Sequence, residues 1–575
     1  MKRQISALAV ISVVILSACS GGGGGDAPVA APPAIITSNE GLKGVASSTA
    51  GMTGTMIAAE KQVGVDNAAR LLTQATFGIT SAQEIQTVRD FGIDAWLVKQ
   101  FSTPAPSHME YLNQQAPRTQ NGKPVDEMAY EAIWQQWLYS PAQLRARMSF
   151  ALSQIFVISN IAPDLRPEAM ASYMDMLNRN AFGNYRQLLE DVTLHPAMGY
   201  YLNMIESEKE DPDKGTHPNE NYAREVLQLF SIGLVQLNLD GTPKKDADGK
   251  TIPTYNEDVV KGFAKAFSGW SFGGRDTTKA NMFASGDENW TIPMQPWASK
   301  HSTATKLLLD GKTLPAGQTP QQDLAAAIDS IFNHPNVAPF ISRRLIQRFV
   351  TSNPTPAYIQ RVATVFANNG AGVRGDLRAV IIAVLTDTEA RDPASVTTGV
   401  YGKQREPVIR FANVLRALNA KAASGHNEIH YLDSADNALG QSPLLAPSVF
   451  NFFSPDFRSP GEISAAGMYA PEFQSTTETT MVGGLNFFAK IIRDGGYGYK
   501  ENQLKLEFTL FDDVAGDANA LIDRINLLFM NQGMTQATRT SMMRAINGID
   551  VKSKTERIRT GLTLASIAPE FVIQK

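Results

Sequence analysis

Apolar residues recur every three to four positions from Asp66 onward, and this helical spacing limits the fold more than any other feature. The range 219–233 shows the pattern most clearly, with Gly233 as the expected end of the helix. Four apolar residues in that range share one helix face: Tyr222, Val226, Leu229 and Phe230. A face of this kind has to be buried against other elements, so the pattern predicts a body made of packed helices.

Side-chain caps mark where several of these helices begin. The stretch Ser81–Glu84 has the capping-box spacing and predicts a helix that runs through Trp96. Thr254–Glu257 has the same spacing and predicts a second start. Asp376, which follows a glycine, predicts a third helix that continues to Leu385.

Strand patterns are sparse by comparison. Residues 234–239 and 250–255 are expected to flank one minor β-hairpin, with Asp-Gly pairs at the turns. Residues 271–300 and 420–475 are rich in Gly, Ser, Pro and aromatic residues and are expected to be long ordered loops. The predicted fold is therefore mainly α: a large, irregular multi-helix body with long ordered loops and one hairpin.

The first 18 residues have the pattern of a secretory signal. Lys2 and Arg3 precede an apolar run from Ile5 to Leu16, which is too short to span a bilayer. The single cysteine of the chain, Cys19, follows Leu-Ser-Ala. This order resembles the lipobox of bacterial lipoproteins, in which the cysteine is acylated and becomes the new N-terminus. Cys19 is therefore the predicted lipidation site, and the acyl chains would bind a membrane.

Three segments follow from this interpretation. Residues 1–18 form the signal peptide, and residues 19–60, rich in Gly, Ala, Pro and Ser, form a flexible tether. Residues 61–575 form the helical body, with lobes expected at 61–285 and 286–575. The serine after the cysteine indicates a bacterial cell-envelope protein that is lipid-anchored at the outer membrane, by analogy with lipoprotein sorting in Gram-negative bacteria.

Charge and composition exclude several classes of function. The chain has 52 Lys and Arg against 56 Asp and Glu, so no basic excess attracts nucleic acid. One cysteine permits no intramolecular disulfide and no site with several thiolates. The sequence lacks a His-Glu-x-x-His motif, a Walker loop and a dinucleotide-binding fingerprint, so no metal and no cofactor is predicted.

The densest polar cluster lies at His217–Glu225 and supplies a candidate enzyme site. In that hypothesis His195 is the base, Glu220 the acid or orienting group, and Arg224 an anion clamp. Additional binding residues are predicted: Asn219, Asn221, Trp270 and His301. The structural alternative is an acidic helix start with an i,i+4 ion pair between Glu220 and Arg224.

Three other groups each have a functional and a structural interpretation. Arg343, Arg344 and Arg348 form either an anion site or a solvated helix face. The aromatic segment 450–457 either stacks on sugars or a partner, or fills a buried loop. Three tryptophans suggest a polymer-binding row as a further function: Trp270, Trp290 and Trp297.

Taken in order, short segments of the chain resemble the bacterial domain-of-unknown-function 1800 family. The matching pieces cover residue 66 to at least residue 475, and they include Ala68–Leu72, His195–Met198, Asn219–Glu225, Ser268–Trp270, Arg343–Leu345, Gly375–Leu377, Lys403–Pro407 and Leu439–Gln441. The resemblance implies a large, mostly helical secreted or envelope protein. It also implies a partner from the domain-of-unknown-function 1501 family, which resembles the alkaline phosphatases and is often encoded nearby.

One stretch departs from the family pattern. Many members carry Trp-His-Asn-His-Phe on an early helix, whereas the matching positions here are Leu152–Phe156, with no histidine. Chemistry that depends on those histidines in other members is therefore in doubt for this chain.

These observations favour an envelope lipoprotein that acts through binding or assembly. The alternative is a hydrolase-type enzyme with a site around His195, Glu220 and Arg224. Polar groups that converge on a pocket would favour the enzyme, and an exposed apolar patch would favour binding or assembly.

Overall fold

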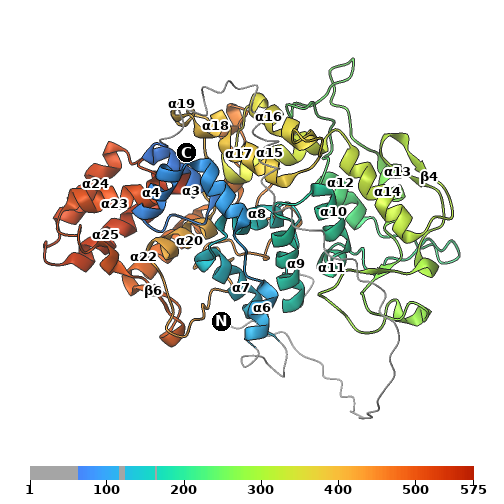
Figure 1. The fold of residues 1–575 in the computed structure, drawn as a ribbon, viewed down its shortest axis with the longest axis horizontal. Coiled ribbons are helices and arrows are strands. Elements are labelled where there is room, and N and C mark those ends of the chain that lie inside the picture. The colour runs from blue at the N-terminus through green and yellow to red at the C-terminus, as the bar shows by residue number, and fades with distance from the viewer. Residues whose placement is uncertain (1–62, 116–123, 162–164) are drawn as a thin grey trace, which may run out of the picture. The chain divides into compact units, whose positions relative to one another are not determined.

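The computed structural model describes residues 63–115, 124–161 and 165–575, and its fold is mainly α as predicted (Figure 1). The predicted signal peptide and tether lie outside these residues, as does Cys19. The helices of the first half are α3 (Val65–Ala75), α4 (Ala82–Phe91), α5 (Ile93–Ser102), α6 (His108–Gln114), α7 (Asp126–Tyr139), α8 (Gln143–Ser153), α9 (Pro167–Asn180), α10 (Tyr185–Leu194), α11 (Pro196–Tyr201), α12 (Asn221–Gln228) and α13 (Glu257–Ala266).

The second half continues in the same style, with several very short helices between longer ones. They are α14 (Pro320–Asn333), α15 (Val337–Phe349), α16 (Pro356–Ala367), α17 (Leu377–Thr386), α18 (Thr388–Arg391), α19 (Pro393–Val396), α20 (Pro407–Ala417), α21 (Glu462–Ala465), α22 (Glu478–Asp494), α23 (Ala518–Met530), α24 (Gln536–Asn547), α25 (Lys554–Ile567) and α26 (Pro569–Val572). Long loops separate α13 from α14 and α20 from α22.

The strands form four antiparallel pairs of two residues each within the described ranges. They are β1 (Trp270–Ser271) with β2 (Gln295–Pro296), β3 (Lys306–Leu307) with β4 (Thr313–Leu314), β5 (Lys403–Gln404) with β8 (Ile573–Gln574), and β6 (Gly496–Tyr497) with β7 (Leu504–Lys505). The pair of β5 and β8 joins the C-terminus to the segment that leads into α20.

A single isolated bridge joins the two arms of the predicted hairpin, and two more bridges involve the segment between them. Val235 pairs with Pro253, but Leu237 pairs with Pro243 and Lys245 with Thr251. The segment 243–245 therefore lies between the two predicted arms and bridges them.

One continuous apolar core extends from Ala68 to Phe571. Helix α7 is buried along most of its length, and its Trp137 stacks on Phe77 with ring centroids 4.4 Å apart. Helix α15 is also buried on most of its faces, and its Leu345, Ile346 and Phe349 are fully buried. A helix that is buried on several faces lies inside a fold, so α7 and α15 are central elements.

Two of the predicted helix starts are confirmed. Ser81 Oγ accepts a hydrogen bond from Glu84 N–H, and Asp376 accepts from the N–H groups of Arg378 and Ala379. Both side chains satisfy amide groups that the first helical turn leaves without partners.

Two other local predictions were wrong. The helix expected through Trp96 is divided into α4 and α5, because Gly92 has a φ of 87° that a helix does not permit. The helix expected from Thr254 starts later: Asn256 caps α13 by accepting from Val259 N–H, and Thr254 instead donates to the Gly233 carbonyl.

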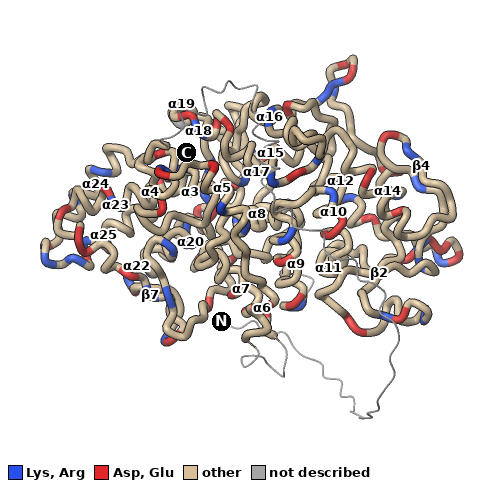
Figure 2. Tube along the Cα trace, viewed as in Figure 1, with Lys and Arg blue, Asp and Glu red and all other residues tan. Residues whose placement is uncertain are grey.

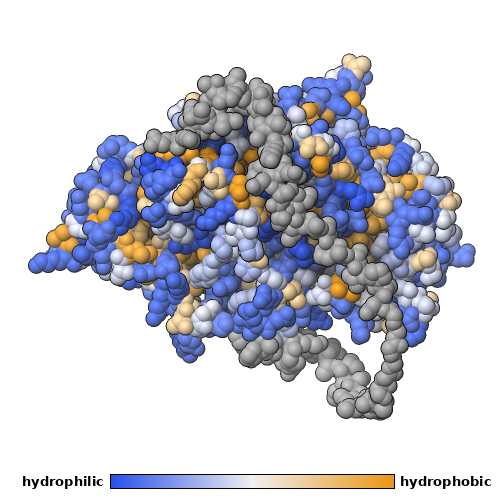
Figure 3. Space-filling model, in the orientation of Figure 1, coloured by the Kyte–Doolittle hydropathy of each residue, from blue (hydrophilic) through white to orange (hydrophobic). Residues whose placement is uncertain are grey.

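Charged and apolar residues are mixed over the surface. Figure 2 shows Lys and Arg interspersed with Asp and Glu along the tube, and Figure 3 shows apolar residues scattered among hydrophilic ones on the face in view. Within the described residues, no helix is both long enough and apolar enough to cross a bilayer.

Gly262 on α13 provides a test of the close packing between α13 and β3. A Cβ atom at Gly262 would lie 1.8 Å from the carbonyl oxygen of Leu307, so Gly262→Ala forces the two elements apart. We expect the free energy of unfolding to fall by about 3 kcal/mol, as measured by urea denaturation.

Gly484 on α22 is the matched control, because it is also helical and a Cβ there would meet nothing within 4 Å. Gly484→Ala is expected to stabilise by about 0.5–1 kcal/mol, since alanine is the better helix former. Equal stability of Gly262→Ala and the wild type would contradict the packing described.

Candidate functional site

His195 lies inside the fold, where it caps a helix. Its Nδ1 accepts from the N–H of Ala197 at 3.2 Å, at the start of α11. Its Nε2 lies 3.3 Å from Ser172 Oγ, and the ring packs edge-on against Tyr173. Burial, with a smaller contribution from Arg179, lowers the pKa of His195 to about 3. The ring is therefore neutral near pH 7, and both nitrogen atoms are engaged within the fold.

Glu220 and Arg224 lie together at the surface. Arg224 Nη2 is 3.2 Å from Glu220 Oε2 and 3.0 Å from Glu257 Oε1, and these side chains are 31–53% exposed. Exposed ion pairs contribute about 0–1 kcal/mol. In the part of the chain that the structure describes, no hydrogen bond or ion pair joins His195 to either residue. The catalytic roles of His195, Glu220 and Arg224 stay predictions, and no contact among the described residues places the three side chains in one site.

Asn219 and Asn221 are exposed and form a local turn. Asn219 Oδ1 accepts from the N–H of Asn221 at 2.9 Å, and Asn221 Nδ2 donates to Asn203 Oδ1 at 3.2 Å. These contacts place both residues at the start of α12, and neither lines either of the two cavities described below.

His301 and Trp270 are both buried, with 1% and 3% of their surfaces exposed. His301 Nε2 lies 2.8 Å from Asp323 Oδ2, and the same carboxylate pairs with Lys306 Nζ at 2.7 Å. The tryptophans proposed as a polymer-binding row, which include Trp290 and Trp297, are buried as well. These three tryptophans form no exposed row on which a polymer could stack, so the structure gives the polymer-binding hypothesis no support.

A cavity of about 440 Å³ lies beside α15, and it brings together two groups that the sequence left open. Its volume is within the range of about 300–1,000 Å³ typical of small-molecule sites. We call it the arginine cavity; it is lined by Gln154, Ile155, Gln228, Leu229, Ile232, Gly233, Leu234, Val235, Leu237, Pro243, Phe340, Arg343, Arg344, Arg348, Val449, Phe450, Ser454, Pro455 and Asp456.

The walls come from four distant parts of the sequence. They are the end of α8, the segment from the end of α12 to Pro243, helix α15, and the loop 449–456. The turn after α12 ends at Gly233, whose φ of 72° allows its N–H to reach the Leu227 carbonyl. A Cβ at Gly233 would lie 2.9 Å from the Phe340 ring, so only glycine fits where this turn meets α15.

Two of the arginines share one carboxylate at the cavity wall. Asp456 Oδ2 lies 3.0 Å from Arg344 Nη2, and Asp456 Oδ1 lies 3.2 Å from Arg343 Nη2. Burial acts to raise the pKa of Asp456, but the guanidinium groups of Arg344 and Arg343 outweigh it and lower that pKa. Asp456 is therefore ionised near pH 7, and the exposure of 49% of its side chain to water also favours the charged form.

Arg348 is the unusual member of the group. It is only 4% exposed, and its guanidinium lies 4.7 Å from the Phe453 ring. It has no hydrogen bond or ion pair from its side chain to any residue in the described ranges. Burial lowers the pKa of Arg348, while Glu406 and Glu472 act in the opposite direction. Because arginine does not deprotonate in proteins, Arg348 is a buried cation without a direct counter-ion.

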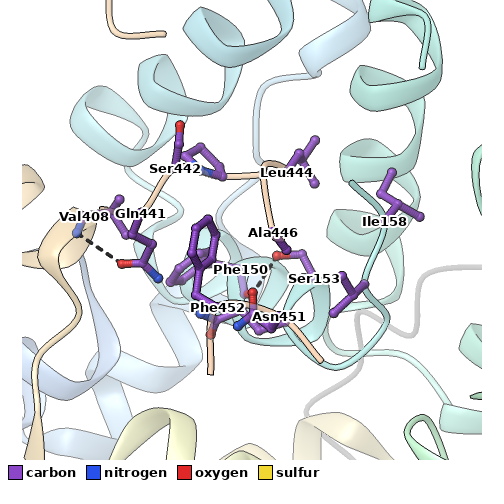
Figure 4. Close-up of a pocket in the computed structure, with 13 residues that line it drawn as sticks. Phe150, Ser153, Ile158, Val408, Gln441, Ser442, Leu444, Ala446, Asn451 and Phe452 are labelled. Carbon is purple, nitrogen blue, oxygen red and sulfur yellow. Dashed lines mark hydrogen bonds between the residues drawn. The ribbon is translucent and has the colours of Figure 1, made fainter. Parts of the chain in front are cut away.

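A buried polar group connects this cavity to a smaller one. Gln154 lines both cavities, and its amide donates to Glu406 Oε2, which also accepts from the Gln441 amide. Figure 4 shows the smaller cavity, of about 20 Å³, between α8 and the loop that carries Gln441 and Asn451. Glu406 Oε1 has no hydrogen-bond partner among the described residues.

The sequence pointed to parts of the arginine cavity but not to the whole. Arg343, Arg344 and Arg348 were weighed as an anion site, and segment 450–457 as a stacking surface or buried loop. The buried-loop interpretation holds for Phe453, which packs on Arg348, whereas Phe450 is 47% exposed. The sequence did contain a clue: Arg343–Leu345, which resembles the family pattern, and Leu152–Phe156, which departs from it, both contribute residues here.

The described residues contain no group of three or more His, Cys, Asp or Glu side chains placed to hold a metal ion. The arginine cavity itself contains three arginines and one carboxylate as its charged groups. Such a lining suits the binding of an anion better than the transfer of a proton, because arginine neither gains nor loses one.

The low pKa of His195 gives a testable dependence of stability on pH. The ring takes up a proton near pH 6.5 in the unfolded chain but only near pH 3 in the folded chain. Unfolding therefore binds a proton between these values, and stability is lost as the pH falls below about 6.5. His195→Asn keeps a capping oxygen and removes the titration.

We expect the difference in unfolding free energy between the wild type and His195→Asn to shrink by about 2 kcal/mol from pH 7 to pH 5. Urea denaturation at each pH measures it. His217, which is exposed, is exchanged in the same way as the matched control for a histidine-to-asparagine change outside the core. If this free-energy difference does not vary with pH, the folded protein does not lower the pKa of His195, and the account of its burial is contradicted.

The comparisons with known proteins identify a family and no closer relative. No curated protein and no solved structure matches the chain. The family model described as "protein of unknown function (DUF1800)" matches residues 70–573, which include every residue that lines the arginine cavity. The match covers most of the sequence, and the chain therefore belongs to the DUF1800 family.

Proposed function

We propose that this protein is a membrane-tethered lipoprotein of the bacterial envelope whose helical body works by binding a ligand in the arginine cavity. The tether is supported by the apolar run that ends in Leu-Ser-Ala before Cys19, and by the Gly-, Ala- and Pro-rich sequence after it. Palmitate or a related acyl chain on Cys19 would hold the body at the outer membrane. The family match says nothing of activity or location.

The observation that carries the binding role is the arginine cavity itself. It combines apolar walls with a few charged groups, the usual make-up of a small-molecule site. No His, Cys, Lys or Tyr side chain is among the residues that line it. Its one carboxylate, Asp456, is held ionised by two arginines and is a poor proton acceptor. Binding therefore accounts for the lining better than catalysis does.

The enzyme alternative has less support. It needs His195, Glu220 and Arg224 in one site, whereas the contacts of His195 are with Ser172 and Ala197. A partner of the domain-of-unknown-function 1501 family remains compatible with the proposal, because a tethered binding protein can deliver what it binds to a second protein.

The lipid anchor is tested by Cys19→Ala. Without the thiol no acyl chain is attached, so the protein should lose labelling by radioactive palmitate and move from the detergent phase to the aqueous phase in Triton X-114 partitioning. Ser20→Ala, one residue away, is the control and should keep the label. Detergent-phase partitioning of Cys19→Ala equal to that of the wild type would contradict the anchor.

The cavity is tested with Nile red, a neutral apolar dye whose fluorescence rises on leaving water. Val235→Trp fills the cavity, and we expect it to abolish a saturable, one-to-one fluorescence increase seen with the wild type. Val551→Trp is the matched control, since Val551 is 52% exposed and is not among the lining residues. Identical titrations for the two variants would show that the dye binds elsewhere and would remove the support for a binding cavity.

A further inference from the structure

Three guanidinium groups face the arginine cavity, and the described residues supply only one carboxylate within ion-pair distance of them. Arg343 and Arg344 share that carboxylate, which belongs to Asp456. Arg348 has none, although it is the most deeply buried of the three. A buried cation without a direct counter-ion is costly to a fold, so its retention in a cavity calls for an anion from outside.

The two glutamates whose charges act on Arg348 make no direct ion pair with it among the described residues. Glu472 is bound through Oε1 by Lys403 Nζ at 2.9 Å, and its Oε2 has no hydrogen-bond partner there. Glu406 is held through Oε2 by the amides of Gln154 and Gln441, and its Oε1 is likewise without a partner. Both glutamates act on Arg348 only through the electric field, which favours its charged form without satisfying its N–H donors.

Most of the remaining lining residues are apolar, the polar exceptions being Gln154, Gln228 and Ser454. The apolar ones include Leu229, Ile232, Val235 and Phe340, which come from the segment after α12 and from α15. A free inorganic ion would leave this surface unused. A molecule with an acidic head and an apolar body would place the head at the arginines and bury the body against these side chains.

We propose that the arginine cavity binds an amphipathic organic anion, a single carboxylate or phosphate head on an apolar chain, with the head paired to Arg348. This inference rests on the proposed binding function and names its ligand class. Arginine presents a planar fork of N–H donors that fits either head in a bidentate manner.

Asp456 then holds the two other arginines of the cavity, beside the proposed position of the ligand head. Its carboxylate already occupies Arg343 and Arg344 from the loop 449–456, and it is half-exposed. The loop is held in place by Gln347 Nε2, which donates to the Pro455 carbonyl at 3.2 Å, and by Ser454 N–H, which donates to Gln474. Neutralising Asp456 would free two guanidinium groups for the ligand and raise its affinity.

The test is calorimetric titration of the full chain, kept free of lipid by Cys19→Ala, with four probes. Octyl phosphate and octanoate distinguish the two acidic heads; octanol has the chain without the charge, and inorganic phosphate has the charge without the chain. We expect one or both amphipathic anions to bind at least about tenfold more tightly than octanol and inorganic phosphate, because a charge-assisted pair and apolar burial act together.

Two substitutions with opposite expected effects identify the contact. Arg348→Gln should weaken binding of the amphipathic anion by about tenfold or more, and Arg348→Lys should retain part of it, because the charge remains while the fork is lost. Asp456→Asn should tighten binding several-fold. If Arg348→Gln proves too unstable to fold, the titration of Asp456→Asn tests the proposed charge contact by itself.

Four results would overturn the inference: octanol binding as tightly as the anions, inorganic phosphate binding as tightly as octyl phosphate, unchanged affinity in a folded Arg348→Gln, or unchanged affinity in Asp456→Asn. If octanol and Nile red both bind and Val235→Trp blocks them, the binding cavity stands and only its charge preference fails. If no probe binds, the proposed binding function fails as well.

Discussion

Helix α15 carries both a buried apolar surface and three arginines, and the elements packed around it have to accommodate both. Leu345, Ile346 and Phe349 pack into the core, while Arg343 and Arg344 reach Asp456. Arg348 points to the same cavity but finds only an aromatic ring. The loop 449–456, the turn after α12 and the end of α8 all close around this stretch, so the cavity is a consequence of how α15 is accommodated.

The local structure could be predicted where a single contact between near neighbours decides it. Asp376 and Ser81 cap their helices as expected, because the acceptor and the donor are at most three residues apart. Thr254 failed because Asn256 competes as the cap and Thr254 is used by the Gly233 carbonyl, 21 residues away. The break at Gly92 was missed because apolar spacing alone does not report a positive φ.

The arginine cavity was even harder to predict from the sequence than the ends of the helices. Each part of the arginine cavity could be read as a pattern: three arginines on a helix, an aromatic loop, and a departure from the family pattern at Leu152–Phe156. Their meeting could not, since Asp456 reaches Arg344 across 112 residues of chain. The hypothesis of a site at His195, Glu220 and Arg224 gains no shared geometry, because the contacts of each residue are local. His195 caps a helix and Glu220 forms a surface ion pair with Arg224.

The central claim is that Arg348 lacks a protein counter-ion because it receives one from a ligand whose body lies on the apolar wall. The most direct measurement is a crystal structure of the protein with 8-bromooctanoate, in which the anomalous signal of bromine locates the far end of the chain. We expect the carboxylate at Arg348 and the bromine peak beside Val235 and Phe340. A cavity without ligand density, or a bromine peak at Arg348 with the carboxylate in solvent, would contradict the account.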